Sequence, residues 1–186
     1  MYHPCQIVAD LYTMLEKFGY LKGLKVAYIG DGNNVCNSLL IGCSKMGLDL
    51  SIACPEGYEP SAEAIRFAEK NSEHSGSKIE ILRDPFSAVK DANVIYTDTF
   101  VSMGDEAERE ERMRVFLPKY QVNSRLLDAA PSDALFMHCL PAHRGEEVTD
   151  EVIDGPRSIV WDEAENRLHT EKAILAEIIK HQAGTS

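Results

Sequence analysis

Short runs of apolar residues alternate with helical patterns along most of this chain of 186 residues. The first pattern is helical, because the apolar residues Ile7, Leu11, Met14 and Phe18 recur three or four positions apart. A proline at position 4 and a glycine at position 19 are typical of the two ends of a helix. The spacing therefore predicts a helix between these two residues.

Six short apolar runs, each ended by turn-forming or polar residues, are typical of buried strands. They cover residues 25–30, 49–54, 78–82, 93–97, 134–138 and 158–161. Helical patterns separate or follow them, at residues 39–46, 61–73, 84–90, 123–129 and 170–181. Strands that alternate with helices favour right-handed crossovers and a parallel sheet covered on both faces. We therefore predict an α/β fold, a Rossmann-like doubly wound parallel sheet with helices on both faces, in a single domain.

Two segments carry unusual surface patterns. Residues 105–114 hold many opposite charges three or four positions apart, which is typical of a solvated helical face. A mobile lid over a neighbouring site is the second interpretation, with about half the weight on the usual meaning of such runs. The last helix has a broad apolar stripe that includes Leu175, Ile178 and Ile179, so we expect another surface to cover it.

Composition narrows the classes of protein. Hydrophobic residues make up 44% and charged residues 26%, no apolar run approaches a membrane span, and no secretory signal opens the chain. Five cysteines are an odd number without a Cys-x-x-Cys pair, so we expect free thiols in a reducing, cytoplasmic compartment and no metal. The net charge of −11 opposes a polyphosphate backbone, so nucleic acid is disfavoured as a partner.

Polar and reactive residues follow several of the predicted strands. The run 134–138 ends at His138 and Cys139, the run 25–30 is followed by residues 31–34, and the run 93–97 is followed by residues 98–103. A fourth cluster, residues 3–6, opens the first helix. Open parallel sheets bind ligands at the carboxyl ends of their strands, so these clusters predict one site built from several loops.

Each cluster also has an ordinary structural interpretation. Asn33 and Asn34 suit a turn or helix cap, Cys139 suits a buried thiol, and His3 suits a frayed terminus. The remaining candidates have such interpretations too: Asp98 and Ser102 as caps, Met103 as core, and Arg167 in a surface ion pair with Glu163 or Glu165. All of these interpretations holding together at strand ends is much less probable than a shared site.

A dinucleotide site is disfavoured at the first strand. Gly30 and Gly32 begin a glycine-rich turn, but Val35 stands where a third glycine belongs. The second predicted strand ends in Ala53 and Cys54 rather than in an acidic residue that would bind a ribose. A dehydrogenase half and a non-catalytic amino-acid-binding module nevertheless remain as alternatives from other classes.

The clusters together resemble the ornithine carbamoyltransferase family, over the C-terminal, ornithine-binding half of that enzyme only. The residues that carry the resemblance are His-Pro-Cys-Gln at 3–6, Asp-Gly-Asn-Asn at 31–34, Ser-Met-Gly at 102–104 and His-Cys-Leu-Pro at 138–141. Aspartate transcarbamylases are similar in fold but differ where Cys139 stands and lack the Ser-Met-Gly signature. An aspartate-type transcarbamylase half is thus the alternative within the superfamily.

The resemblance implies roles for nine residues. Asn34, Asp98, Ser102 and Met103 would bind the α-amino and carboxylate groups of ornithine, while His3, Gln6 and Arg167 would contact the carbamoyl group. Cys139 and Leu140 would contact both substrates, and Cys139, Asp98 and Arg167 would be catalytic. The resemblance also implies a cis bond between Leu140 and Pro141.

The implied reaction is attack of the ornithine δ-amine on carbamoyl phosphate, which gives citrulline and phosphate without a cofactor. The family's phosphate-binding loop and most trimer contacts belong to an N-terminal carbamoyl-phosphate domain, which the sequence does not contain. We therefore interpret residues 1–186 as the ornithine-binding domain of a homotrimeric enzyme, inactive or nearly so on its own. We also expect the apolar faces of its first and last helices to be bare.

Overall fold

Five short parallel strands form the centre of the computed structural model, which describes residues 1–102, 104 and 106–183. The strands are β1 (Lys25–Ile29), β2 (Asp49–Ala53), β3 (Ile79–Leu82), β4 (Val94–Thr97) and β5 (Leu135–His138). Their order across the sheet is β3-β2-β1-β4-β5. The chain therefore winds outward from β1 in one direction, returns, and continues on the other side, which confirms the predicted doubly wound α/β fold.

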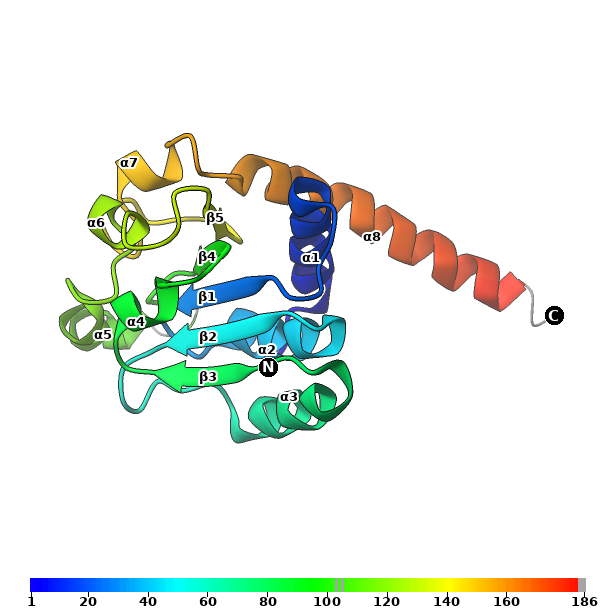
Figure 1. Cartoon of the computed structure of the whole chain (residues 1–186), viewed down its shortest axis with the longest axis horizontal. Helices are drawn as coiled ribbons and strands as arrows, with labels where there is room; N and C mark the ends of the chain where they lie inside the picture. The colour runs from blue at the N-terminus through cyan, green and yellow to red at the C-terminus, as the bar shows by residue number, and fades with distance from the viewer. Residues whose placement is uncertain (103, 105, 184–186) are drawn as a thin grey trace.

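Helices cover both faces of this sheet (Figure 1). One face packs against α1, α2 and α3, and the other packs against α4 to α7. The bounds are α1 (Pro4–Phe18), α2 (Asn34–Met46), α3 (Ala62–Ser75), α4 (Pro85–Val89), α5 (Arg109–Phe116), α6 (Ser124–Leu127), α7 (Asp150–Ile153) and α8 (Val160–Ala183), with a short 3-10 helix η1 (Glu106–Glu108) before α5.

The alternating burial of strand residues explains the two cores. In β1, Val26 and Tyr28 join the core under α1, α2 and α3, whereas Ala27 and Ile29 join the opposite core. Successive side chains of a strand point to opposite faces, so a strand covered on both sides must be apolar throughout. This is why the strands could be recognised as continuous apolar runs.

One predicted strand is wrong. Residues 158–161 contribute only a single bridge, between Ser158 and Phe136, and the chain enters α8 at Val160. Asp162 and Glu163 lie in the first turn of α8, where the helix dipole favours negative charge. A short apolar run alone does not distinguish a strand from a buried helix start, and here the acidic residues decide for the helix.

The charged segment near residue 110 is helical, but the prediction of a purely solvated face missed one buried residue. Arg112 on α5 is 6% exposed, forms an ion pair with Asp31 and donates from Nε to the carbonyl oxygen of Phe100 at 2.7 Å. Its guanidinium also lies over the rings of Tyr58 and Phe116. This segment is therefore anchored to the body of the protein through Arg112.

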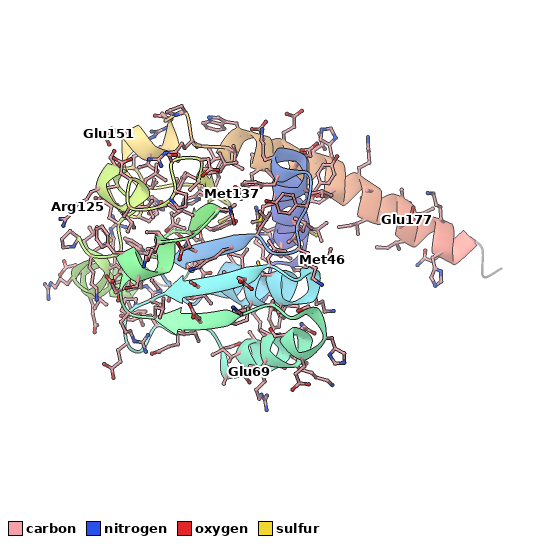
Figure 2. The ribbon with its side chains drawn as sticks, in the orientation of Figure 1. Met46, Glu69, Arg125, Met137, Glu151 and Glu177 are labelled. Atoms are coloured by element: carbon pink, nitrogen blue, oxygen red, sulfur yellow. The ribbon has the colours of Figure 1, made fainter. Side chains whose placement is uncertain are left out.

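The first and last helices pack against each other, and α8 then continues beyond the body of the protein (Figure 1). The side chains along this extension, where Glu177 lies, stand clear of the rest of the molecule (Figure 2). Large apolar side chains are exposed on both helices, as predicted: Val8, Tyr12, Leu15, Trp161, Leu168, Leu175, Ile178 and Ile179. Among the described residues, no helix has the length and apolar character that crossing a membrane requires.

Candidate active site

The register of the sheet brings three strand ends together. Ile29 pairs with Thr97, and Thr97 pairs with His138, so β1, β4 and β5 end side by side. This edge is the switch point of the fold, because the chain leaves β1 toward β2 on one side and β4 lies on the other. A cavity of about 360 Å³ opens there. Its lining includes His3, Asn34, Asp98, Ser102, Cys139, Leu140 and His143.

The structure thus brings together six of the nine residues predicted for the site. Gln6 and Arg167 do not line this cavity and lie next to each other behind it, with Arg167 Nη1 donating to Gln6 Oε1 at 3.1 Å. Met103 lies outside the described residues. The prediction that strand-end clusters converge is therefore confirmed for the loops after β1, β4 and β5.

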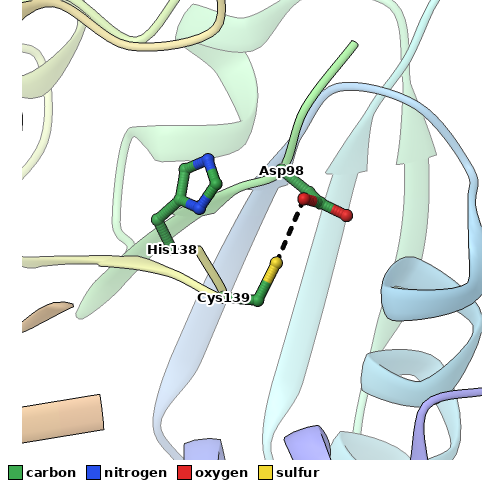
Figure 3. A group of neighbouring side chains, drawn as sticks. All are labelled: Asp98, His138 and Cys139. Carbon is green, nitrogen blue, oxygen red and sulfur yellow. Dashed lines mark hydrogen bonds between the residues drawn. The ribbon is translucent and has the colours of Figure 1, made fainter. Parts of the chain in front are cut away.

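Asp98 is the polar centre of the cavity. The thiol of Cys139 donates to Asp98 Oδ1 at 3.0 Å, as the dashed line in Figure 3 shows. The backbone N–H of Thr99 donates to the same oxygen at 2.7 Å, and Asn33 Nδ2 donates to Oδ2 at 2.7 Å. Three donors from three chain segments therefore fix the orientation of this carboxylate.

Asn33 was predicted to be a possible helix cap, and it is one. Its side-chain oxygen accepts from the backbone N–H groups of Val35 and Cys36 at the start of α2. Its amide nitrogen is then free to donate to Asp98, so one side chain links the helix start to the carboxylate. The preceding Gly32 has no room for a Cβ atom, which would overlap the backbone of Glu59 and Pro60. The Asn33 connection was missed from the sequence, because a capping asparagine reveals nothing about a partner 65 residues away.

The thiol of Cys139 is held in its neutral form. Burial raises the pKa of Cys139 well above its ordinary value, and the charge and hydrogen bond of Asp98 raise this pKa further. At neutral pH Cys139 therefore donates its proton to Asp98 and is a poor nucleophile, since the thiolate is the reactive form.

The turn after Cys139 has two unusual backbone features. The bond between Leu140 and Pro141 is cis, as predicted, and Leu140 has a positive φ of 54°. The N–H of Leu140 donates to His138 Nδ1 at 2.9 Å, and His138 Nε2 lies 3.2 Å from Glu147 Oε1. Because Nδ1 is the acceptor, the proton of a neutral His138 belongs on Nε2, toward Glu147. Both ring nitrogens of this buried histidine are thus engaged.

His3 lines the cavity at the start of α1. His3 lies just before the first turn of α1, and its backbone N–H donates to Ser38 Oγ at 2.7 Å. Burial lowers the pKa of His3, and the positive charge of Arg167 lowers this pKa further. Arg167 also forms an ion pair with Glu171 at 2.7 Å, rather than with Glu163 or Glu165 as its surface interpretation had it.

Two groups of side chains within the described residues have the composition of a metal site. One comprises Asp98, His138 and Cys139, and the other comprises His143, Glu146 and Glu147. In the first group the nitrogens of His138 and both oxygens of Asp98 already have hydrogen-bond partners. In the second group, Glu146 forms an ion pair with Arg109. These interactions compete with metal binding, so neither group is a strong candidate for a metal site.

Comparison with known proteins identifies the family. A family model described as "Aspartate/ornithine carbamoyltransferase, Asp/Orn binding domain" matches residues 22–178. The chain belongs to this family. As a member of the aspartate/ornithine carbamoyltransferase family it is 62% identical over 174 residues to the ornithine carbamoyltransferase of Pyrococcus horikoshii, covering 94% of this chain and 55% of that protein. It is also 60% identical over 178 residues to that of Bacillus subtilis, covering 96% and 56% respectively.

Solved structures in the carbamoyltransferase family match the fold closely. The ornithine carbamoyltransferase of Pyrococcus furiosus superimposes with a TM-score of 0.90 at 59% identity, covering 95% of this chain and 56% of that one. The anabolic enzyme of Campylobacter jejuni gives 0.90 at 39% identity, covering 97% and 60%. This chain therefore spans about half the length of the carbamoyltransferases that it matches.

Proposed function

We propose that this chain is the ornithine-binding domain of an ornithine carbamoyltransferase, which transfers the carbamoyl group of carbamoyl phosphate to the δ-amine of ornithine. The observation that carries the proposal is the cavity where Asn34, Asp98, Ser102 and Cys139 meet at the switch point of the sheet. Relatives at 62% and 60% identity that are named ornithine carbamoyltransferases support ornithine, rather than aspartate, as the acceptor.

The polar lining suits an amino acid with a second amine. Asn34 and Ser102 offer an amide and a hydroxyl for the α-amino and carboxylate groups, and Asp98 offers a negative charge for an ammonium group. Met103 would complete this set, a role that rests on the resemblance alone. Hydrogen bonds from Asn33, Thr99 and Cys139 to Asp98 supply a carboxylate whose orientation is set before the substrate binds.

The chemical difficulty is the proton of the attacking amine. An alkyl amine has a pKa of about 10.4, so its deprotonation at pH 7 costs about 4.6 kcal/mol. A carboxylate alone would raise the pKa of the amine, so desolvation in the cavity must oppose that effect. We assign Asp98 as the group that receives the proton, directly or through Cys139. The neutral thiol of Cys139 would contact the amine without forming a covalent intermediate.

The carbamoyl group would lie between the Cys139–Leu140 turn and α1. His3, Gln6 and Arg167 come from this side, and the Arg167–Gln6 hydrogen bond fixes the guanidinium relative to the helix. A cation and the N–H groups of a helix start polarise a carbonyl oxygen and stabilise the negative charge that develops on it during attack. Arg167 therefore has a catalytic role in the proposal, with His3, Gln6 and Leu140 as carbamoyl contacts.

The phosphate of carbamoyl phosphate needs further cations. Among the described residues that line the cavity, no arginine or lysine occurs. We propose that a carbamoyl-phosphate domain outside these 186 residues supplies them, and that it covers the bare apolar faces of α1 and α8. The complete enzyme would be a cytoplasmic homotrimer that contributes to arginine biosynthesis.

The test is an assay of citrulline with the chain alone and with an added carbamoyl-phosphate domain of a related enzyme. We expect at most trace citrulline from the chain alone, because one wall and the phosphate cations are missing. Complementation should raise citrulline formation, and Asp98→Asn should abolish the gain. Glu69→Gln, at an exposed residue of α3, is the control that should leave the gain unchanged.

Two results would contradict the proposal in different ways. Turnover by the isolated chain near an ordinary 1 to 1000 per second would refute its dependence on a second domain. Calorimetry with the complemented protein tests the acceptor, because heat with aspartate or NAD but not with ornithine would indicate a different class. Absence of heat with all three would leave a fragment without this binding function.

A further inference from the structure

Two buried carboxyl groups meet behind the cavity, and the proposed reaction does not use either of them. Asp10 on α1 is 0% exposed, and Glu163 on α8 is 1% exposed. Both carboxyl groups are contacted by Gln6 Nε2 and by the hydroxyl of Tyr96, so they lie next to each other although they come from opposite ends of the chain. A hydrogen bond between two carboxyl groups requires a proton on one of them, because an ionised carboxylate only accepts.

Every oxygen of this pair also has a donor. Gln6 Nε2 donates to Asp10 Oδ1 at 2.8 Å and to Glu163 Oε1 at 3.0 Å. The hydroxyl of Tyr96 on β4 lies 3.2 Å from Asp10 Oδ2 and 3.0 Å from Glu163 Oε1. The backbone N–H of His138 donates to Glu163 Oε2 at 3.0 Å. The pair therefore connects α1, α8, β4 and the end of β5 at a single point.

The charge on this pair is limited by its surroundings. Among the described ion pairs, none joins a cation to Asp10 or Glu163, and Arg167 instead contacts Gln6 and Glu171. Two adjacent carboxylates that are both buried and have no ion pair with a cationic side chain of the described residues are strongly destabilised, so one of them keeps its proton.

We propose that Asp10 and Glu163, joined by one shared proton, are positioning residues of the candidate active site. On one side the pair fixes the amide of Gln6, whose oxygen accepts from Arg167. On the other side it holds the backbone that leads into the Cys139 turn. Its function is to keep the carbamoyl-contacting groups and the thiol turn at a constant separation, an assignment that rests on the proposed function.

Several titratable groups face the pair. Burial raises the pKa of Asp10 from 3.8 to about 7, and burial together with the charge of Asp10 raises the pKa of Glu163. Arg167 lowers the pKa of Asp10, while Tyr96 and the thiols of Cys43 and Cys139 are kept neutral by burial, with Asp10 among the charges that raise each pKa. Among the groups that face the pair, the shared proton is therefore the one that we expect to titrate near pH 7.

The shared proton is directly observable in the 186-residue chain. Infrared spectra at pH 6 should contain the carbonyl stretch of a protonated carboxyl group, since ordinary aspartate and glutamate side chains are ionised well below this pH. We expect the band to shift in Glu163→Gln and in Asp10→Asn, where one buried carboxyl group remains, and to disappear in the double variant. It should persist in Glu165→Gln, a matched change at an exposed residue of the same helix. A wild-type spectrum without the band would overturn the shared proton.

The positioning role is tested by the reactivity of Cys139. Glu163→Ala removes the acceptor of the His138 N–H, so the turn should open and alkylation of Cys139 by iodoacetamide should rise about tenfold, because reactivity follows access and thiolate fraction. Glu163→Gln keeps an oxygen acceptor and should restore the wild-type rate. Hydrogen exchange of the His138 amide should follow the same order. Equal rates in Glu163→Ala and Glu165→Gln would refute the role.

These measurements need no substrate, so they can fail or succeed independently of the transferase assay. If Glu163→Ala does not fold, the wild-type infrared band and the exchange rates in Glu163→Gln and Asp10→Asn still decide the proposal. In the complemented enzyme, Glu163→Ala should lower kcat more than it changes KM for ornithine, and Glu163→Gln should rescue kcat. A KM effect alone would overturn the assignment to the carbamoyl and thiol side of the site.

Discussion

At the scale of single residues, the thiol of Cys139 is controlled by one carboxylate. Burial comes first among the causes that raise the pKa of Cys139, and the charge and hydrogen bond of Asp98 follow. Asp98→Asn removes the charge, so the pKa of Cys139 should fall and its thiolate fraction should rise. We expect alkylation at pH 8 to accelerate about tenfold for each unit by which the pKa falls. Mass spectrometry of the alkylated Cys139 peptide measures the rate.

Cys5 provides an internal control for this experiment. It is the other partly exposed thiol among the five free cysteines, and it does not contact Asp98 in the described hydrogen bonds. Its alkylation should be the same in both proteins. A slower reaction of Cys139 in Asp98→Asn would show that Asp98 activates the thiol rather than keeping it neutral.

The shared proton of Asp10 and Glu163 also predicts a pH dependence of stability. Both pKa values are raised in the folded state, so the folded protein binds more protons than the unfolded chain above about pH 4. The free energy of unfolding contributed by this pair is therefore complete at low pH and declines as pH rises through about 7. Between about pH 4 and pH 7, the free energy of unfolding of Glu163→Gln should therefore increase relative to that of the wild type by about 1.4 kcal/mol for each unit of pH.

Urea denaturation at several pH values measures this difference. Glu165→Gln should run parallel to the wild type, because that exposed side chain takes no part in the pair. Parallel curves for Glu163→Gln and the wild type would mean that the buried pair does not carry the proton.

The sequence predicts the residues of the site better than their contacts. Cys139, Asp98 and Asn34 could be chosen because each follows an apolar run, and parallel strands end at a common edge. The Asn33–Asp98 and Gln6–Glu163 contacts join segments 65 and 157 residues apart, and no local pattern specifies them. Gln6 shows the difference clearly, since its motif was recognised but its burial against two carboxyl groups was not.

At the scale of elements, the strands were predictable because burial on both faces leaves a continuous apolar run. Three of the first five runs, 78–82, 93–97 and 134–138, end at the same residue as the observed strand, and the other two end one residue beyond it. The order of the strands does not follow from such runs, because any of several right-handed windings gives the same alternation. The run 158–161 failed because its length and composition fit a helix start equally well.

Helix α5 makes a separate prediction, because its charges are not equivalent. Arg112 is buried against Asp31, whereas the side chains of Arg114 and its partner Glu110 are 80% and 92% exposed. Arg112→Met leaves the Asp31 carboxylate without this cation in a buried place, so the free energy of unfolding should fall by about 3–5 kcal/mol. Arg114→Met breaks an exposed pair and should change it by less than about 1 kcal/mol.

Thermal unfolding of the two variants tests this difference. The double variant Arg112→Met with Asp31→Asn should recover part of the loss, because the uncompensated charge is then removed as well. Equal effects of Arg112→Met and Arg114→Met on the free energy of unfolding would support the interpretation from the sequence alone, in which α5 presents a solvated face.

At the scale of the whole molecule, many of the large exposed apolar side chains lie on two helices that pack together. Trp161, Leu168 and Leu175 are spaced seven residues apart on α8, and Val8 and Leu15 have the same spacing on α1. Residues seven positions apart lie on one face of a helix, so each helix presents a continuous apolar stripe. Contiguous exposed stripes of this kind mark surfaces that associate with another protein.

The isolated chain should therefore self-associate through α8, even though its net charge of −11 opposes contact between copies. Sedimentation velocity should give a coefficient that rises with protein concentration and with salt, because salt screens the repulsion. Leu175→Gln with Ile179→Gln removes apolar area from the extension without changing charge, and it should restore a monomer. Lys172→Gln with Glu177→Gln, also neutral in sum and exposed on α8, should not restore a monomer.

If the surface that covers α8 is a carbamoyl-phosphate domain, adding that domain should suppress self-association of the wild type. Continued self-association in its presence would mean that α8 serves contacts between copies instead.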